Sequence, residues 1–168
     1  MNTRNKRPVL QLPLTPTEYG LEVFAVLGLL FGAVAASVYW TRLPESIPTH
    51  FGAAGQPDAW GAKWNLLLMP VVALAMYALL TILSRFPHIY NYPVRITEEN
   101  AERQYRIARS LMYWMKAEIV WLFTYIEWQS IQTALGRSSG LGVLMTPVTL
   151  VILFATAVVH YLRMRRAR

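Results

Sequence analysis

The chain alternates long apolar runs with shorter polar segments. Val23–Trp40 and Leu66–Leu83 contain no charged residue, and Leu141–Leu162 contains only His160 among basic and acidic residues. A run of about 18 apolar residues is long enough to cross the roughly 30 Å hydrocarbon core of a bilayer as a helix. We therefore predict membrane-spanning helices over about residues 20–41, 64–84 and 140–162.

A fourth apolar run, Leu111–Leu135, is interrupted by Lys116, Glu118 and Glu127. Charged groups inside a bilayer are costly and normally face protein or water. We predict a fourth span over about residues 110–135 whose polar side chains face other helices. Lys116 and Glu118 lie near one end, where we expect them to snorkel to the interface. Glu127 lies deeper, so it is either protonated or partnered by another helix.

These spans predict an all-α fold, an integral membrane four-helix bundle. Residues 18–168 form one four-span domain, and residues 1–17 form a tail that is flexible or orders on contact. Thr146-Pro147 fits either a helix that starts at Pro147 or a kink in a longer helix, and we favour the kink. Small residues in the first span leave a smooth stripe for packing of another helix or, alternatively, of a second copy. They are Ala25, Gly28, Gly32 and Ala36.

The positive charges indicate an orientation. The formal net charge is +7, and most cations lie before the first span, between the second and third, and after the fourth. The other loops contain only Arg42, Lys63 and Arg137. By the positive-inside rule, both termini are cytoplasmic and the loop between the first two spans is extracytoplasmic. This placement accounts for the charge without a nucleic acid, so we expect no nucleic-acid partner.

An amphipathic helix is predicted before the third span. Thr97 can cap it, and Glu99 with Arg103 and Glu102 with Arg106 have the i,i+4 spacing of helical ion pairs. These charges form either a solvated face or a docking surface for a cytoplasmic partner.

The sequence contains no signature of an enzyme. It has no HExxH, GxSxG, P-loop or dinucleotide-binding motif, and it has no cysteine. Its three histidines are predicted to lie on different sides of the membrane, which prevents a shared metal site in one copy. We expect no catalytic residue, no metal and no cofactor.

The extracytoplasmic loop Thr41–Asn65 contains the most specific residue pattern. Ile47-Pro48 predicts extended backbone, and glycines at 52, 55 and 61 allow positive φ. Tryptophans on either side can seat the loop at the membrane interface. The candidate residues, which either bind a ligand or partner or structure the loop itself, are His50, Phe51, Gly52, Gly55, Pro57, Asp58, Trp60, Gly61 and Lys63.

Two segments carry a resemblance to a known family. They are LPESIPTHFGAAGQPDAWGAK, residues 43–63, and NYPVRITEENAERQYRIARSLM, residues 91–112. The sequence resembles bacterial membrane proteins with the domain of unknown function 1648, of the SdpI/YhfL-like type, in a short four-span form. The resemblance implies a multi-pass protein of the bacterial cytoplasmic (inner) membrane. The resemblance to longer relatives implies a role in immunity and signal transduction. The family has no established catalytic residues that could be assigned to positions of this sequence.

We therefore expect a non-enzymatic receptor, immunity or accessory protein that binds an extracytoplasmic peptide or partner through residues 43–63. One alternative is a small oligomeric transporter or an ion or proton pathway that uses Glu127, Glu118 and Lys116. A second alternative is a membrane-bound enzyme. The expected partners are the lipid bilayer, an extracytoplasmic peptide or protein and, as an open alternative, further copies of the chain.

Overall fold

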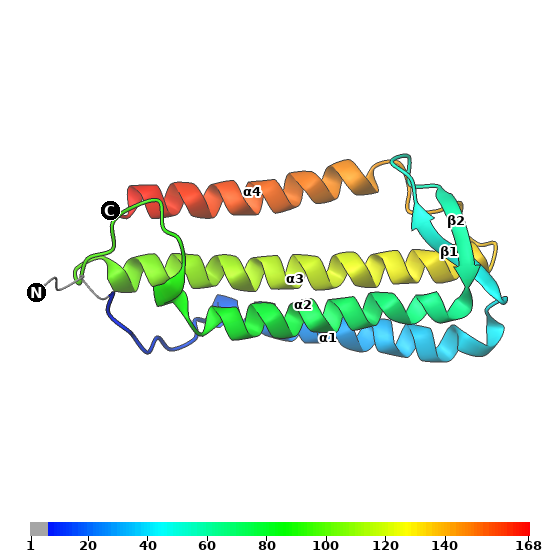
Figure 1. The fold of residues 1–168 in the computed structure, drawn as a ribbon, viewed down its shortest axis with the longest axis horizontal. Coiled ribbons are helices and arrows are strands. Elements are labelled where there is room, and N and C mark those ends of the chain that lie inside the picture. The colour runs from blue at the N-terminus through cyan, green and yellow to red at the C-terminus, as the bar shows by residue number, and fades with distance from the viewer. Residues whose placement is uncertain (1–6) are drawn as a thin grey trace, which may run out of the picture.

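The computed structural model describes residues 7–168, which form four long helices and one small β-hairpin. The elements are α1 (Pro16–Tyr39), β1 (Ser46–Phe51), β2 (Pro57–Ala62), α2 (Leu68–Ser84), α3 (Ala101–Ala134) and α4 (Met145–Arg166). The helices run along the long axis of the molecule (Figure 1). Residues 40–67 and 135–144 form one end, here called the hairpin end. Residues 7–15, 85–100 and 163–168 form the other, here called the tail end.

Helix α3 is the centre of the bundle. Helices α1 and α2 pack along it on one side, and α4 packs against it on another (Figure 1). Large apolar side chains of the outer helices point away from the protein, for example Leu27, Leu74 and Phe154, which are 52%, 57% and 67% exposed. Such surfaces are stable in lipid and not in water. The predicted all-α membrane bundle is confirmed.

Three of the four helical segments are long and apolar enough to cross a membrane: Pro16–Arg42, Lys63–Ser84 and Met145–Arg166. Helix α3 contains more charge, but its 34 residues are ample for a span at 1.5 Å per residue. It also continues without a break from the predicted amphipathic helix into the predicted third span. Its buried residues include Lys116 and Glu127, so the charged side chains face protein, as predicted.

The small-residue stripe of α1 packs against α3. Ala25 is fully buried, and an added Cβ at Gly28 would lie 2.9 Å from Val120 Cγ1. At Gly32, an added Cβ would lie 2.6 Å from Glu127 Oε2. The helix-packing interpretation of this stripe is therefore confirmed, and the stripe is covered by α3 within a single copy.

The N-terminal segment is ordered by contact from residue 7 onward, while residues 1–6 lie outside the described part. Arg7 donates to the carbonyls of His88 and Tyr90, at 3.2 and 2.5 Å. Thr15 and Glu18 form a reciprocal capping box at the start of α1, with distances of 3.2 and 2.7 Å. The first helix therefore begins at Pro16, slightly before the predicted span.

The loop between α2 and α3 packs back onto the bundle. Tyr90 donates to the Leu83 carbonyl at 2.6 Å, and Tyr92 donates to the Pro87 carbonyl at 2.7 Å. Burial raises the pKa of Tyr90 to about 12, so this hydroxyl remains a donor at neutral pH. The loop is thus held in place by its tyrosines.

The start of α3 differs in detail from the prediction. Thr97 and Asn100 bond each other's backbone N–H groups one turn before the helix, and Asn100 is the residue that precedes it. The predicted Glu102–Arg106 pair is present at 2.8 Å. The predicted Glu99–Arg103 pair is absent, because Arg103 donates instead to the carbonyls of Ala167 and Arg168. Those contacts join α3 to the end of α4.

Helix α4 begins at Met145, so Pro147 lies in its first turn. The favoured kink in a longer helix is therefore not found. Proline fits the first turn because the N–H groups there have no partner within the helix. Residues 135–144 form turns instead, with positive φ at Gly136, Gly140 and Gly142.

A glycine substitution tests the α1–α3 contact. We predict that Gly28→Ala lowers the unfolding free energy by about 1–3 kcal/mol, because the new methyl group overlaps the Val120 side chain. Gly20→Ala is the matched control in the same helix, since nothing lies within 4 Å of its added Cβ. It should be neutral or stabilising by up to about 1 kcal/mol. Thermal unfolding in detergent measures both, and equal effects would contradict the close packing.

Candidate functional site

The candidate loop folds into an antiparallel hairpin. Ser46 pairs with Ala62 and Pro48 pairs with Trp60, with register irregularities on either side of His50. The predicted extended backbone at Ile47-Pro48 is confirmed. The hairpin adds a small two-stranded sheet to an otherwise helical fold.

The base of the hairpin is anchored in an apolar cluster. Ile47 is 1% exposed and packs with Leu43, Leu66 and Ile131, together with small residues of α1. Ile131 belongs to the last turns of α3. The hairpin is therefore fastened to three helical segments through one buried side chain.

The tip of the hairpin is fastened to the loop between α3 and α4. Leu141 N–H donates to the Gly55 carbonyl at 2.7 Å. Gly55 has a φ of 75°, and an added Cβ there would lie 2.5 Å from the Gly142 carbonyl oxygen. Gly55 is thus required both for its left-handed backbone and for a close approach of two loops.

Gly52 and Gly61 do not have positive φ, so the predicted role for them is wrong. These positions are glycine because neighbouring atoms leave little room for a side chain. An added Cβ at Gly52 would lie 3.0 Å from Asp58 Oδ2. At Gly61, it would lie 3.0 Å from side-chain atoms of Asn65 and Thr49.

His50 and Asp58 form the polar centre of the exposed hairpin surface. His50 Nδ1 and Asp58 Oδ1 are 2.5 Å apart, and the side chains are 68% and 54% exposed. They pair with each other across the hairpin. Trp60 is 53% exposed on the second strand. The structure therefore leaves an acidic group, an imidazole and an indole accessible together on one small element.

The remaining loop candidates hold the hairpin's shape. Phe51 and Pro57 pair at the last position of the ladder and are partly buried. Lys63 donates to Glu45 at 2.7 Å and lies 5.8 Å from the Trp40 ring centroid. Trp40 in turn packs on the exposed Trp64, which gives the base of the hairpin an aromatic rim.

Lys116 is buried in the bundle, so the expected snorkelling is wrong. Its side chain is 1% exposed and its ammonium group contacts the Glu22 carboxylate. Thr81 Oγ1 lies 3.1 Å away. The rings of Tyr77 and Tyr113 lie 4.8 and 4.3 Å from the ammonium nitrogen. These four side chains, here called the Lys116 cage, stabilise the ammonium group inside the bundle, so Lys116 does not extend to the membrane–water interface.

Glu22, together with Glu18, is a functional group that the sequence interpretation missed. Glu18 pairs with Arg109 at 2.8 Å in a buried contact. The two acids are four residues apart in α1, and their partners Arg109 and Lys116 are seven residues apart in α3. Each spacing returns to the same face of its helix. Two acids on one face of α1 and two cations on one face of α3 were therefore the sequence signal that could have predicted both ion pairs.

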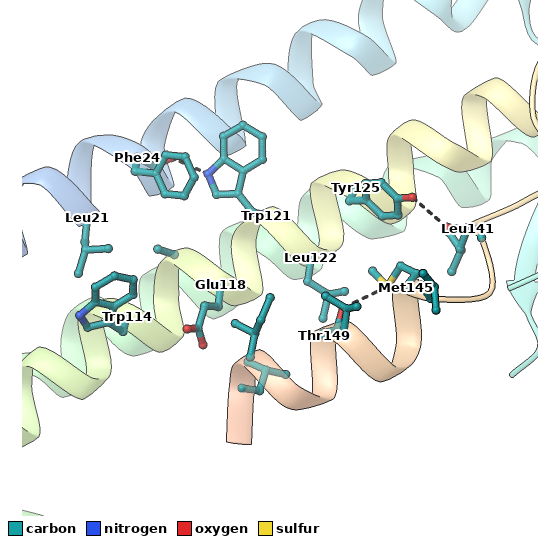
Figure 2. A pocket seen from close by; sticks show the side chains of 16 residues that line it. Leu21, Phe24, Trp114, Glu118, Trp121, Leu122, Tyr125, Leu141, Met145 and Thr149 are labelled. Carbon is teal, nitrogen blue, oxygen red and sulfur yellow. Dashed lines mark hydrogen bonds between the residues drawn. The ribbon is translucent and has the colours of Figure 1, made fainter. Parts of the chain in front are cut away.

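Glu118 faces α4. Thr156 donates to its carboxylate at 2.5 Å. Glu118 also lines a groove of about 560 Å³ between α1, α3 and α4, here called the α4 groove. Figure 2 shows Glu118, Leu122 and Tyr125 projecting from α3 into this groove, with Met145 and Thr149 on α4. The groove is otherwise lined mainly by apolar side chains.

Glu127 faces α1. It is 1% exposed, and its Oε1 atom has no hydrogen-bond partner among residues 7–168. Lys116, Glu118 and Glu127 therefore face three different surroundings, and the structure does not bring them together into one cluster. In the described part of the chain, no group of three His, Asp or Glu residues could hold a metal ion.

Comparisons with known proteins identify one segment of the chain. Residues 26–74 match the family described as Domain of unknown function (DUF1648). This segment contains most of α1, the hairpin and the beginning of α2, so the predicted resemblance to the domain of unknown function 1648 is confirmed for residues 43–63, while residues 91–112 lie outside the match. An uncharacterized protein of Archaeoglobus fulgidus is 32% identical over 89 residues, 48% of this chain and 49% of the relative. The chain thus spans about half the length of that relative. No solved structure matches the chain.

The contact at the hairpin tip predicts a glycine-specific loss of stability. Gly55→Ala and Gly136→Ala both place a side chain at positive φ, which costs about 1–2 kcal/mol. Only Gly55→Ala also meets the backbone of Gly142, since nothing lies near Gly136. We predict a clearly lower unfolding temperature for Gly55→Ala than for Gly136→Ala in detergent. Equal temperatures would show that the two loops do not touch.

The Lys116 cage predicts non-additive mutational effects. Lys116→Met should cost about 3 kcal/mol, because it leaves the Glu22 carboxylate without its cation. Adding Glu22→Gln should recover part of that loss, as a double-mutant cycle measures. Arg106→Met is the control, since its partner Glu102 is exposed and such pairs contribute about 0.5 kcal/mol. Additive effects of the Glu22 and Lys116 substitutions would refute the pairing.

Proposed function

We propose that this DUF1648-containing membrane protein is a non-enzymatic binding protein of the bacterial cytoplasmic membrane. Its hairpin faces the extracytoplasmic side and binds a peptide or protein partner. The observation that carries this proposal is that the His50–Asp58 pair and Trp60 are all exposed on the same hairpin. A rigid element that presents an aromatic ring with adjacent polar groups has the composition of a protein-binding hot spot.

The rigidity of the hairpin supports binding over a merely structural role for these three side chains. The buried Ile47 and the Gly55–Leu141 contact hold the hairpin at both of its ends. None of these contacts involves the side chains of His50, Asp58 or Trp60. A preformed surface binds with a smaller loss of conformational entropy than a flexible loop.

The distribution of arginines supports the proposed orientation. The tail end carries several, among them Arg85, Arg95 and Arg163, while the hairpin end carries only Arg42, Lys63 and Arg137 as cations. Cations concentrate on the cytoplasmic side of membrane proteins. On this assignment, α3 connects the extracytoplasmic hairpin to cytoplasmic residues through one continuous helix. A receptor or immunity role would use that connection, and an accessory role would need only the hairpin.

The alternative of an ion or proton pathway through Lys116, Glu118 and Glu127 has less support. Glu118 faces α4, whereas Lys116 and Glu127 contact α1 at positions two turns or more apart, and Lys116 is already held by Glu22. Their separation favours individual structural or binding roles over a single relay.

Photocrosslinking tests the proposed surface. A photoreactive amino acid in place of Ala59, next to Trp60 in β2, should yield a protein or peptide adduct in intact cells. The double substitution His50→Ala/Asp58→Ala or the single substitution Trp60→Ala should reduce that adduct at least tenfold, or about 1.4 kcal/mol of affinity. Ala53→Ser, exposed on the same hairpin, is the control and should leave it unchanged. Adducts with lipid alone would show that the hairpin is only a membrane anchor.

A further inference from the structure

Glu127 borders a cavity of about 250 Å³ between α1, α2 and α3, here called the Glu127 cavity. Leu30 and Ala33 of α1 and Pro70 and Leu74 of α2 line it. This cavity is separate from the α4 groove and from the hairpin surface.

The carboxyl group of Glu127 is buried without a partner in this cavity. The residue is 1% exposed, and Oε1 forms no hydrogen bond within the described residues 7–168. Lys116 lies eleven residues earlier in the same helix, about 16 Å away along the axis, and its ammonium group is held by Glu22. No ion pair to Glu127 is formed in that part of the chain. A buried carboxyl with an unused acceptor is costly unless a donor reaches it.

Gly32 and Thr124 lie next to the Glu127 carboxyl group in the cavity. These three residues are here called the floor of the cavity. The missing side chain at Gly32 lets the Glu127 carboxyl lie directly against α1. Thr124 uses its hydroxyl hydrogen on the Gly28 carbonyl, at 3.2 Å, so its oxygen presents acceptor capacity to the cavity. With Glu127 ionised, the floor offers acceptors and, among residues 7–168, no free donor.

The walls and rim of the cavity are apolar. Leu30 and Leu74 are 56% and 57% exposed on the outer surface of the bundle, where the cavity opens between α1 and α2. The volume lies just below the range of about 300–1,000 Å³ that holds drug-sized ligands. A small molecule could enter laterally from the hydrocarbon phase of the membrane.

From these features we propose that the Glu127 cavity is a binding site for a small hydrophobic amine. Its ammonium group donates to the Glu127 carboxylate and the Thr124 hydroxyl oxygen, and its hydrocarbon part packs on Leu30, Ala33, Pro70 and Leu74. The ammonium group supplies both the positive charge and the donors that this floor lacks. This site is independent of the partner proposed for the hairpin.

Photoaffinity labelling of the purified full chain in nanodiscs tests the site. The probe is an eight-carbon alkylamine that carries a diazirine, and the matched probe has a hydroxyl group in place of the amine. The amine probe should label residues 29–33 or 70–74, as located by mass spectrometry, and excess hexylamine should compete. Labelling by the alcohol probe should be at least tenfold weaker, because a neutral hydroxyl forms no ion pair.

Three variants separate the site from general lipid contact. Glu127→Gln should reduce the amine adduct at least tenfold, while Glu118→Gln, which alters the α4 groove, should leave it unchanged. Ala33→Leu fills the rim without touching the carboxyl and should also reduce labelling, which keeps the test valid if Glu127→Gln fails to fold. Equal labelling by both probes, no adduct in these segments, or an undiminished adduct in both Glu127→Gln and Ala33→Leu would overturn the proposal. None of these measurements involves the hairpin, so failure of the amine-site proposal can be distinguished from failure of the proposed hairpin function.

Discussion

The need to shield the polar side chains of α3 from lipid determines how the bundle is assembled. Three charged groups of this helix are each matched by a neighbour: Arg109 by Glu18, Lys116 by Glu22 and Glu118 by Thr156. Unpaired charges in a bilayer cost several kcal/mol, so helices that supply partners are held against α3. This explains why the most polar helix is the central one. The apolar helices α1, α2 and α4 take the lipid-facing positions.

The hairpin depends on the same central helix. Its buried Ile47 packs near Ile131 in the last turns of α3, and its tip bonds the loop that follows α3. A strand pair of this length is marginal by itself, so these two attachments supply its stability. The surface with His50, Asp58 and Trp60 is therefore a rigid extension of the bundle.

The sequence predicts the spans well because hydrophobic length is a local property. It also predicts extended backbone before Pro48, since proline restricts its neighbour directly. The partner of Lys116 was beyond such reasoning, because Glu22 is 94 residues away in the sequence and becomes a neighbour only through the packing of α1 along α3. Likewise, the pairing of His50 with Asp58 depends on an irregular strand register. Local rules allow Pro147 either in the first turn of a helix or at a kink within a longer helix. Because residues 135–144 form turns, α4 begins at Met145 and Pro147 lies in its first turn.

This assembly requires α3 to cross the membrane despite its charges. Because the sequence contains no cysteine, single cysteines on either side of α3 can be labelled without background. Glu99→Cys and Ser139→Cys occupy exposed positions before and after the helix. A membrane-impermeant maleimide added to intact cells should label Ser139→Cys at once and Glu99→Cys only after permeabilisation. Labelling of both cysteines from outside would contradict a membrane-crossing α3.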